Sequence, residues 1–209
     1  MELIGSSRKN LISLFSFDSK WLKEHSEMTG FNRISTLSLI ESACIKLNDM
    51  KRSEFFTLVQ PLTTKLYSFA FSLLPDDLQS EQLVVDGLNA FLLKERKNIL
   101  NREINLTNKK DMQLLRRTYF KGILRTMSEI GVRRAHQLSE QMKLSRPVHY
   151  EAFYALDPKI RFAVKLRYEG QFNVEEIEDI MQVPRYEVIE RLHNGRFLMI
   201  SNLNAGVDA

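Results

Sequence analysis

The side chains of this 209-residue chain whose type and spacing point to chemistry are basic ones gathered in one segment. Residues 94–134 hold twelve basic side chains against four acidic ones, a net charge of +8. Such a block is typical of a surface that binds a polyanion, most often nucleic acid. The alternative is a solvated helix face without a ligand. The basic residues are Lys94, Arg96, Lys97, Arg102, Lys109, Lys110, Arg116, Arg117, Lys121, Arg125, Arg133 and Arg134.

The sequence carries no pattern typical of an enzyme. Its four histidines are dispersed, and no His, Cys and carboxylate spacing resembles a metal site. No phosphate-binding glycine loop or nucleophile motif is present, so we expect no catalysis, no metal, no cofactor and no small-molecule substrate. The single cysteine, Cys44, fits a reducing cytoplasm. No apolar run reaches the length of a membrane span and no signal peptide is evident, so a cytoplasmic protein is expected.

The elements that must position the basic block are predicted to be helices throughout. Apolar residues recur at steps of three and four over residues 34–47, 54–74, 80–92 and 114–138, and no segment alternates like a strand. Pro61 should kink the second helix or mark an early boundary. Pro75-Asp76-Asp77 forms a turn, and Ser80 can cap the third helix. Residues 94–111 are expected to form a loop with a helical portion, and Gly131 should interrupt or bend the last helix.

The C-terminal part predicts a compact unit of three helices. Asp157 caps a first helix that starts at Pro158 and stops at Gly170. Asn173 and Glu176 form a capping-box pattern for the second helix. The last helix, residues 185–200, should bury Val188, Ile189, Leu192, Phe197 and Leu198. Two helices joined by the short turn of residues 182–184 indicate a helix-turn-helix, although such pairs also occur as plain structural hairpins.

A family resemblance runs through this C-terminal unit. It resembles the C-terminal domain of bacterial sigma factors, closest to the extracytoplasmic-function group. The residues that carry it are Leu156-Asp157-Pro158, Val164 to Gly170, Val174-Glu175-Glu176-Ile177, Val183-Pro184, Val188, Arg191-Leu192-His193 and Arg196. The resemblance implies that the last helix reads promoter DNA through the residues Arg185, Tyr186, Glu187, Glu190, Arg191, Asn194 and Arg196.

Residues 54–134 are similar to the N-terminal domain of the same family. The matching residues are Phe55-Phe56, Pro61, Leu66 to Ala70, Leu74 to Asp77 and Glu81 to Val84. The resemblance implies that one helix docks on RNA polymerase through Glu81, Gln82, Val85, Asp86 and Asn89. It also implies that a later helix captures melted DNA, with an aromatic beside a basic track, through Arg116, Arg117, Tyr119, Lys121, Arg125, Arg133 and Arg134.

We therefore expect an all-α, two-domain protein of the sigma type. Its expected partners are core RNA polymerase, double-stranded and locally melted promoter DNA, and an anti-sigma factor. The expected boundaries are 1–50 for a helical segment of unknown role, 51–135 and 151–203 for the two domains, 136–150 for a linker and 204–209 for a tail.

Several positions depart from the family pattern and keep two rivals open. The family usually has an acid at Gln82 and a glutamine at Val85. It commonly has Gly-Thr at Tyr186-Glu187, so the last helix here is unusually acidic for a phosphate-rich ligand. One rival is a sigma mimic that binds an anti-sigma factor or polymerase but no promoter. The other is a helix-turn-helix regulator independent of polymerase. Tyr119 is equally compatible with an ordinary core aromatic, and Arg191 with a surface ion pair to Glu187.

Overall fold

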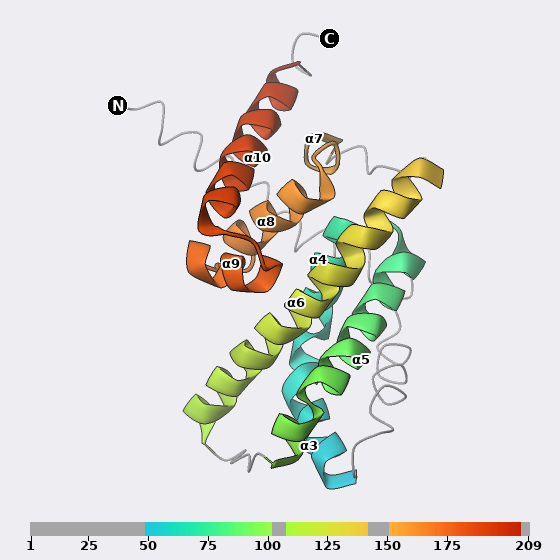
Figure 1. Ribbon diagram of the computed structural model, residues 1–209, viewed down its shortest axis with the longest axis vertical. Coiled ribbons are helices and arrows are strands. Elements are labelled where there is room, and N and C mark those ends of the chain that lie inside the picture. Colours follow the sequence, from blue (N-terminus) through green and yellow to red (C-terminus); the bar gives the residue numbers. More distant parts are fainter. Residues whose placement is uncertain (1–48, 102–107, 142–150, 206–209) are drawn as a thin grey trace.

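The computed structural model describes residues 49–101, 108–141 and 151–205, and every regular element in these ranges is a helix (Figure 1). The all-α prediction is therefore confirmed for the described residues. The helix expected at residues 34–47 lies outside them. The elements are α3 (Asp49–Val59), the 3-10 turn η2 (Gln60–Leu62), α4 (Thr63–Leu73), α5 (Asp77–Asn101), α6 (Lys109–Gln141), α7 (Glu151–Tyr154), α8 (Pro158–Tyr168), α9 (Val174–Met181) and α10 (Arg185–Ala205).

Local signals placed the breaks between the first helices correctly, with one exception. Pro61 lies in the 3-10 turn between α3 and α4, which confirms that it marks a helix boundary. The cap of α5 is Asp76, whose Oδ1 accepts a hydrogen bond of 2.9 Å from the Gln79 amide. The prediction that Ser80 caps this helix was wrong. Ser80 is buried inside α5, and its hydroxyl donates to the Leu74 carbonyl at 2.6 Å.

The two long helices extend further than their apolar pattern indicated. The segment expected to be a loop with a helical portion is helical over residues 94–101, which continue α5. Helix α6 begins at Lys109 after Asn108, whose Oδ1 accepts from the Lys110 amide at 3.1 Å. Helix α6 runs unbroken for 33 residues through Gly131 and through the first six residues of the expected linker. The predicted interruption at Gly131 was wrong. Figure 1 shows α5 and α6 lying side by side as a long antiparallel pair.

Gly131 has a packing role instead of a breaking one. A Cβ atom at this position would lie 2.7 Å from Leu73 Cδ1 and 2.8 Å from Leu83 Cδ2. These distances are shorter than van der Waals contact, so a larger residue would force the Leu73 and Leu83 side chains to shift. The residue is therefore a point of close helix contact.

The C-terminal helices begin where the sequence predicted, and α10 continues five residues past its expected end, to Ala205. The Asp157 side chain accepts from the Lys159 amide at 2.8 Å, and Asn173 and Glu176 form both hydrogen bonds of a capping box, at 2.8 and 3.1 Å. Helix α9 ends at Gln182, which has a left-handed backbone with φ of 54°. Three residues then separate α9 from α10.

The buried face of α10 was only partly predicted. Val188 and Leu192 are buried, as expected, but Ile189, Phe197 and Leu198 are 51%, 64% and 39% exposed. The expectation that these three belong to the core was wrong. Helix α10 turns its 188–192–195–199 face inward, where Gly195 allows contact with Val164 and Ile160 of α8. Periodicity alone does not say which of two apolar faces meets the neighbouring helix.

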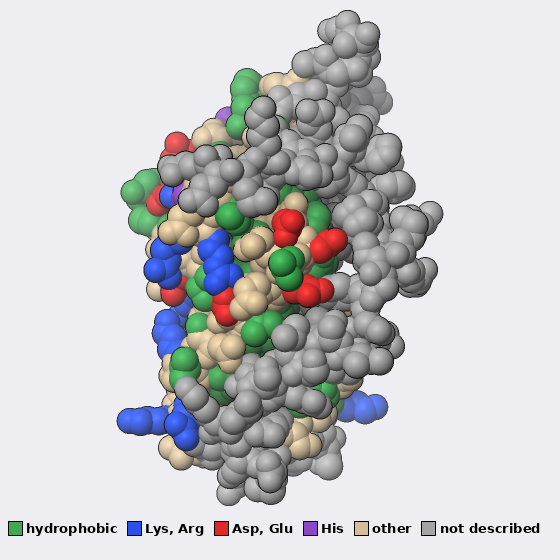
Figure 2. Space-filling model, turned by 90° about the vertical axis from the view of Figure 1, so that its right-hand side faces the viewer, with side chains coloured by type: hydrophobic (Ala, Val, Ile, Leu, Met, Phe, Trp, Pro, Cys, Tyr) green, Lys and Arg blue, Asp and Glu red, His purple; other side chains and the backbone are tan. Residues whose placement is uncertain are grey.

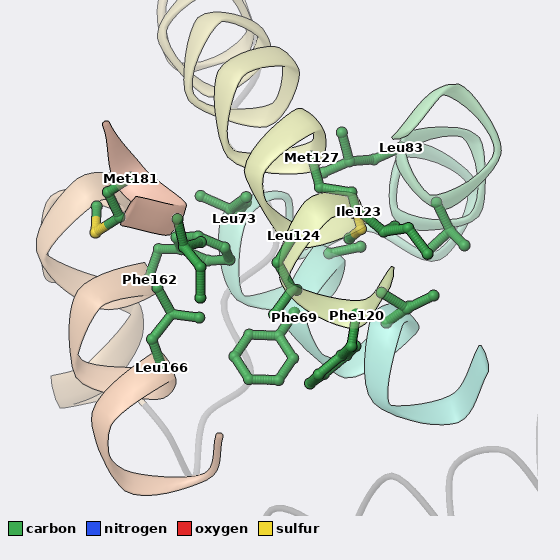
Figure 3. Close-up of a cluster of buried hydrophobic side chains, with 14 of the residues drawn as sticks. Phe69, Leu73, Leu83, Phe120, Ile123, Leu124, Met127, Phe162, Leu166 and Met181 are labelled. Carbon is green, nitrogen blue, oxygen red and sulfur yellow. The ribbon is translucent and has the colours of Figure 1, made fainter. Parts of the chain in front are cut away.

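Buried side chains of α4 and α6 pack directly against α8 and the loop that follows it (Figure 3). The Phe69 ring lies 5.8 Å from the Phe120 ring and 6.0 Å from the Phe162 ring, both edge to face. The Phe120 ring lies 5.9 Å from that of Phe172. The N-terminal helices α3–α6 and the C-terminal helices α7–α10 thus share one apolar core in this structure.

Candidate nucleic-acid interface

Three basic residues of α6 form a row on one face, which we call the α6 strip: Arg117, Lys121 and Arg125. Their spacing of four residues places them one turn apart along the helix. The strip faces α9, and every one of its side chains meets a carboxylate there.

The ion pairs of the α6 strip involve two acids of α9. Arg117 binds Glu176 with both ends of its guanidinium, Nε to Oε1 at 3.1 Å and Nη2 to Oε1 and Oε2 at 2.7 and 2.9 Å. Lys121 Nζ lies 3.9 Å from Glu176 Oε1. Arg125 pairs with the Asp179 carboxylate and also donates to the Asp179 carbonyl at 3.0 Å. In this structure the strip is already occupied by anions of the same chain.

The environment of Glu176 favours its ionised form. Partial burial by itself would raise the pKa of this carboxyl group. Hydrogen bonds from Arg117 and the Asn173 amide, with the positive charges of Arg117 and Lys121, outweigh that effect and lower the pKa below its usual value. Glu176 is therefore a carboxylate at neutral pH, and it both caps α9 and neutralises the strip.

The aromatic residue expected beside the basic track is part of the core. Tyr119 is 5% exposed, with its ring 5.7 Å from that of Phe55 and 5.5 Å from that of Phe91. Its ring cannot stack on a nucleic-acid base in this arrangement. The structure therefore places Tyr119 as a core aromatic, the alternative that its sequence context also allowed.

The remaining basic residues expected to contact melted DNA lie on other faces of α6. Arg116 donates to the Thr57 carbonyl of α3 at 3.3 Å. Arg133 donates to the Glu129 carbonyl at 3.0 Å. Arg134 pairs with Asp86 of α5, so one residue expected to bind DNA contacts one expected to bind polymerase. The seven predicted residues thus do not form a single surface, and only Arg117, Lys121 and Arg125 are aligned.

A pocket of about 360 Å³ opens beside the α6 strip. Its walls come from α5, α6 and α9, and it combines aromatic and apolar side chains with Lys121, Arg125 and Asp179. The volume falls in the range of small-ligand sites. The lining residues are Phe91, Glu95, Asn98, Ile99, Thr118, Tyr119, Lys121, Gly122, Arg125 and Asp179.

The outer face of α10 carries a mixture of polar and apolar side chains. Arg185 and Glu190 are exposed, and Tyr186 is 70% exposed between them. Ile189 and Phe197 share this outward face. A face of this composition can hydrogen-bond to base edges through its polar residues, and it can also pack against a protein.

Three of the residues expected to read DNA on α10 have partners within the C-terminal helices. Arg191 pairs with Glu187 one turn earlier, and its side chain is only 12% exposed. Arg196 donates to the Tyr168 hydroxyl and lies over that ring at 5.7 Å. The i,i+4 pair that the spacing of Arg191 and Glu187 allowed is thus present.

Helix α5 presents an outward row of the residues expected to contact polymerase. Gln82 is exposed, Val85 and Asn89 are half-buried, and the row ends in Leu78 and Leu93, which are 71% and 60% exposed. Gln82 donates to Asp86 at 3.0 Å. The spacing of three and four residues makes the row a continuous face for a partner helix.

Acidic residues surround the start of this α5 row. Tyr67 donates a hydrogen bond of 2.6 Å to Asp77. Burial, this bond and the charges of Asp77, Glu81 and Asp76 raise the pKa of the Tyr67 hydroxyl. Burial and the Asp77 charge also raise the pKa of Glu81. Figure 2, which views the side on which α5 lies in Figure 1, shows acidic side chains gathered around an exposed apolar one, with basic side chains beside them.

No similarity to a known protein family or curated protein indicates the function of this chain. No known family model matches this chain. No curated protein is significantly similar to it either. Among the described residues, no helix is long and apolar enough to cross a membrane, and no three His, Cys, Asp or Glu side chains come together in a way that could hold a metal ion.

The sequence did not predict that two basic residues of α8 are buried. Arg161 is 4% exposed and donates to the Leu73 carbonyl at 3.1 Å and to the Tyr154 carbonyl at 2.9 Å. Lys165 is 1% exposed and pairs with Glu169 at 2.8 Å. Lys165 pairs with a residue one turn later, but Arg161 depends on carbonyl acceptors of α4 that lie almost ninety residues earlier in the chain.

Proposed function

We propose that this protein is a transcription initiation factor of the sigma type, which binds core RNA polymerase and directs it to promoter DNA. The observation that carries the proposal is the pair α9 and α10, joined by a three-residue turn, with the first turns of α10 exposed. A helix so presented fits the major groove, the only groove wide enough for it. Arg185, Tyr186 and Glu190 are then the residues that reach base edges and phosphates.

The outward row of α5 supports the polymerase part of the proposal. Apolar anchors at Leu78, Val85 and Leu93, with polar Gln82 and Asn89 between them, suit packing against a helical hairpin of another protein. The acids Asp77 and Glu81 at the edge of this row favour a partner with basic residues. The row is remote in sequence from α10, so one chain can hold polymerase and DNA with different helices.

The test is co-purification of the full chain with core RNA polymerase from its host, followed by in vitro transcription of genomic fragments. A complex that starts transcripts at discrete sites supports the proposal. Arg185→Ala should reduce these transcripts without weakening the complex, whereas Lys65→Ala, an equal charge change on α4, should affect neither. Failure to form a complex overturns the proposal, and DNA binding by the chain alone then favours the polymerase-independent regulator.

A second candidate is a sigma mimic that binds polymerase or an anti-sigma factor without recognising promoters. Three observations favour it. The α6 strip is occupied by acids of α9, and Tyr119 is buried. In addition, the exposed Tyr186, Ile189 and Phe197 make the outer face of α10 suitable for protein contact. A stable polymerase complex that yields no transcripts from any fragment is the result this candidate requires.

A further inference from the structure

The two acids that occupy the α6 strip stand where a nucleic-acid backbone would place phosphates. Arg117 and Arg125 are eight residues apart, which corresponds to about 12 Å along a helix. Lys121 lies midway between them. Glu176 and Asp179 of α9 supply the oxygens that these three cations contact. A row of cations of this length spans two or three phosphates of a single strand.

Carboxylate and phosphodiester oxygens compete for the same donors. A guanidinium binds either group through two parallel hydrogen bonds, and Arg117 makes such a two-pronged contact with Glu176. A strand laid along α6 would need the same nitrogen atoms. The strip therefore cannot hold both ligands at once.

We propose that Glu176 and Asp179 of α9 act as an internal substitute for a phosphodiester strand, and that a nucleic-acid strand binds the α6 strip only by displacing them. This inference rests on the proposed function in one respect, that the chain binds nucleic acid. It assigns the strand to α6 and gives α9 an inhibitory role that is separate from promoter reading by α10.

The ion pairs between the α6 strip and α9 are exposed enough for a competing anion to replace the carboxylates. The Arg117 and Asp179 side chains are 50% and 49% exposed, and their partners Glu176 and Arg125 are 17% and 28% exposed, so water and salt reach both ion pairs. Exposed ion pairs contribute about 0.2–1 kcal/mol each. A multivalent polyanion that also releases counterions gains more than this, so it can exchange for the two carboxylates.

The pocket beside the strip supports the same assignment. Asp179 lies in its wall together with Lys121 and Arg125, and aromatic side chains form another part of the lining. A strand whose phosphates replaced Asp179 on Arg125 would run past the mouth of this pocket. Displacing the acid thus opens both the cations and the adjoining cavity to the ligand.

The experiment compares two double variants of the full chain that change the net charge equally. Glu176→Gln/Asp179→Asn removes the acids that touch the strip. Glu175→Gln/Glu178→Gln removes two acids of the same helix that make no hydrogen bond or ion pair with α6. Gln at position 176 can still accept the capping hydrogen bond from the Asn173 amide. Binding to a labelled 20-nucleotide single strand and to its duplex is measured by fluorescence anisotropy from 50 to 300 mM salt.

We expect the strip variant to bind the single strand roughly tenfold more tightly than the control variant, because two exposed ion pairs no longer compete. Its salt dependence should steepen by about 2 in logarithmic slope, because each additional phosphate contact adds about 0.7. Adding Arg117→Ala and Arg125→Ala should abolish the gain. A gain restricted to the duplex, or equal affinities of the two variants, would overturn the inference.

The outcome stays separate from that of the proposed function. Equal affinities remove the inhibitory role of α9 even if the chain forms a transcribing complex with polymerase. Loss of polymerase binding overturns the proposed function even if the strip variant gains affinity for the strand. If the double variant does not fold, as judged by circular dichroism, the single changes Asp179→Asn and Glu178→Gln provide the same comparison, since neither residue caps α9.

Discussion

Besides the shared apolar core, two polar contacts join the N-terminal helices to the C-terminal ones, and they use the same kind of side chain in opposite surroundings. At the first contact, which we call the seam, α8 inserts Arg161 and Lys165 against α4, where both are almost fully buried. At the second, which we call the rim, α6 and α9 meet through the α6 strip, Glu176 and Asp179, and most of these side chains remain partly exposed.

The surroundings decide what each contact can do. In the seam, Arg161 donates to the carbonyls of Ser72 and Leu73 at the C-terminal end of α4, where a helix leaves carbonyls without partners of its own. Ser68 donates to Glu169, which also binds Lys165. Arg161, Lys165 and Ser68 are almost fully buried, so their polar groups depend on these partners and the seam holds the helices in one arrangement. The rim has water on one side and can exchange its partners.

The largest expected effect comes from the seam. Arg161→Met leaves the ends of α4 and α7 with buried carbonyls that have lost their donor. We expect a loss of about 3 kcal/mol in the free energy of unfolding, since each unsatisfied buried group costs roughly 1–3 kcal/mol. Urea unfolding measures the change, with Arg185→Met on the exposed start of α10 as the control. Equal stability of the two variants would mean that the seam is no stronger than the surface.

A second change asks whether the seam is a coupled unit. Lys165→Met removes the ion-pair partner of the Glu169 carboxylate, whose side chain is 20% exposed. We expect this change to lower the free energy of unfolding by about 2 kcal/mol. Adding Glu169→Leu removes the unpaired carboxylate and should recover most of that loss, because apolar replacements of buried ion pairs are often neutral or stabilising. A double-mutant cycle by urea unfolding measures the coupling, and strictly additive losses would show that the two residues act independently.

The rim should contribute less, and its contribution should depend on salt. Glu176→Gln/Asp179→Asn is expected to lower the free energy of unfolding by about 1 kcal/mol at 50 mM salt, and by much less at 500 mM. Glu175→Gln/Glu178→Gln serves as the matched control. A loss of stability that is unchanged at high salt would mean that the rim behaves like the buried seam, and the proposed difference between the two contacts would be wrong.

The smallest effect concerns acidity at the rim. Because the folded protein lowers the pKa of Glu176, this residue stabilises the fold above its unfolded pKa of about 4.3. That contribution is lost as the pH falls through the lowered folded value. The stability difference between the wild type and Glu176→Gln should therefore be full at pH 7 and decline as the pH falls below about 4.3 and through the lowered folded pKa. Thermal unfolding over this range measures it, and a difference that grows toward low pH would contradict the assignment.

Helix boundaries could largely be predicted because their causes are local. Asp157 and Asn173 cap with side chains that reach only two or three residues along the chain, and Pro61 lacks the amide that a continuous helix needs. Ser80 was wrongly predicted as the cap of α5, because Asp76, four residues earlier at the turn, accepts the capping hydrogen bond instead. The extent of α5 and α6 was underestimated because polar stretches carry no periodic signal even when they are helical.

The face that each helix turns to its neighbours could not be predicted. Tyr119 fits either a DNA-binding track or a core, and only the rings of Phe55 and Phe91 settle its place in this structure. Ile189 and Phe197 have a helical spacing but point outward because α8 meets the other side of α10. The row of basic residues on α6 was evident, but its carboxylate partners lie more than fifty residues away.

The amino-acid sequence by itself determined that the described chain is helical, where most of its helices begin, and that basic charge concentrates in α6, because caps, prolines and charge density act over a few residues. Tertiary structure alone decided that Arg161 and Lys165 are buried, that Gly131 is a contact point, and that α9 neutralises the α6 strip. Those outcomes depend on which helices meet, and this is set by the packing of distant apolar faces rather than by any local pattern.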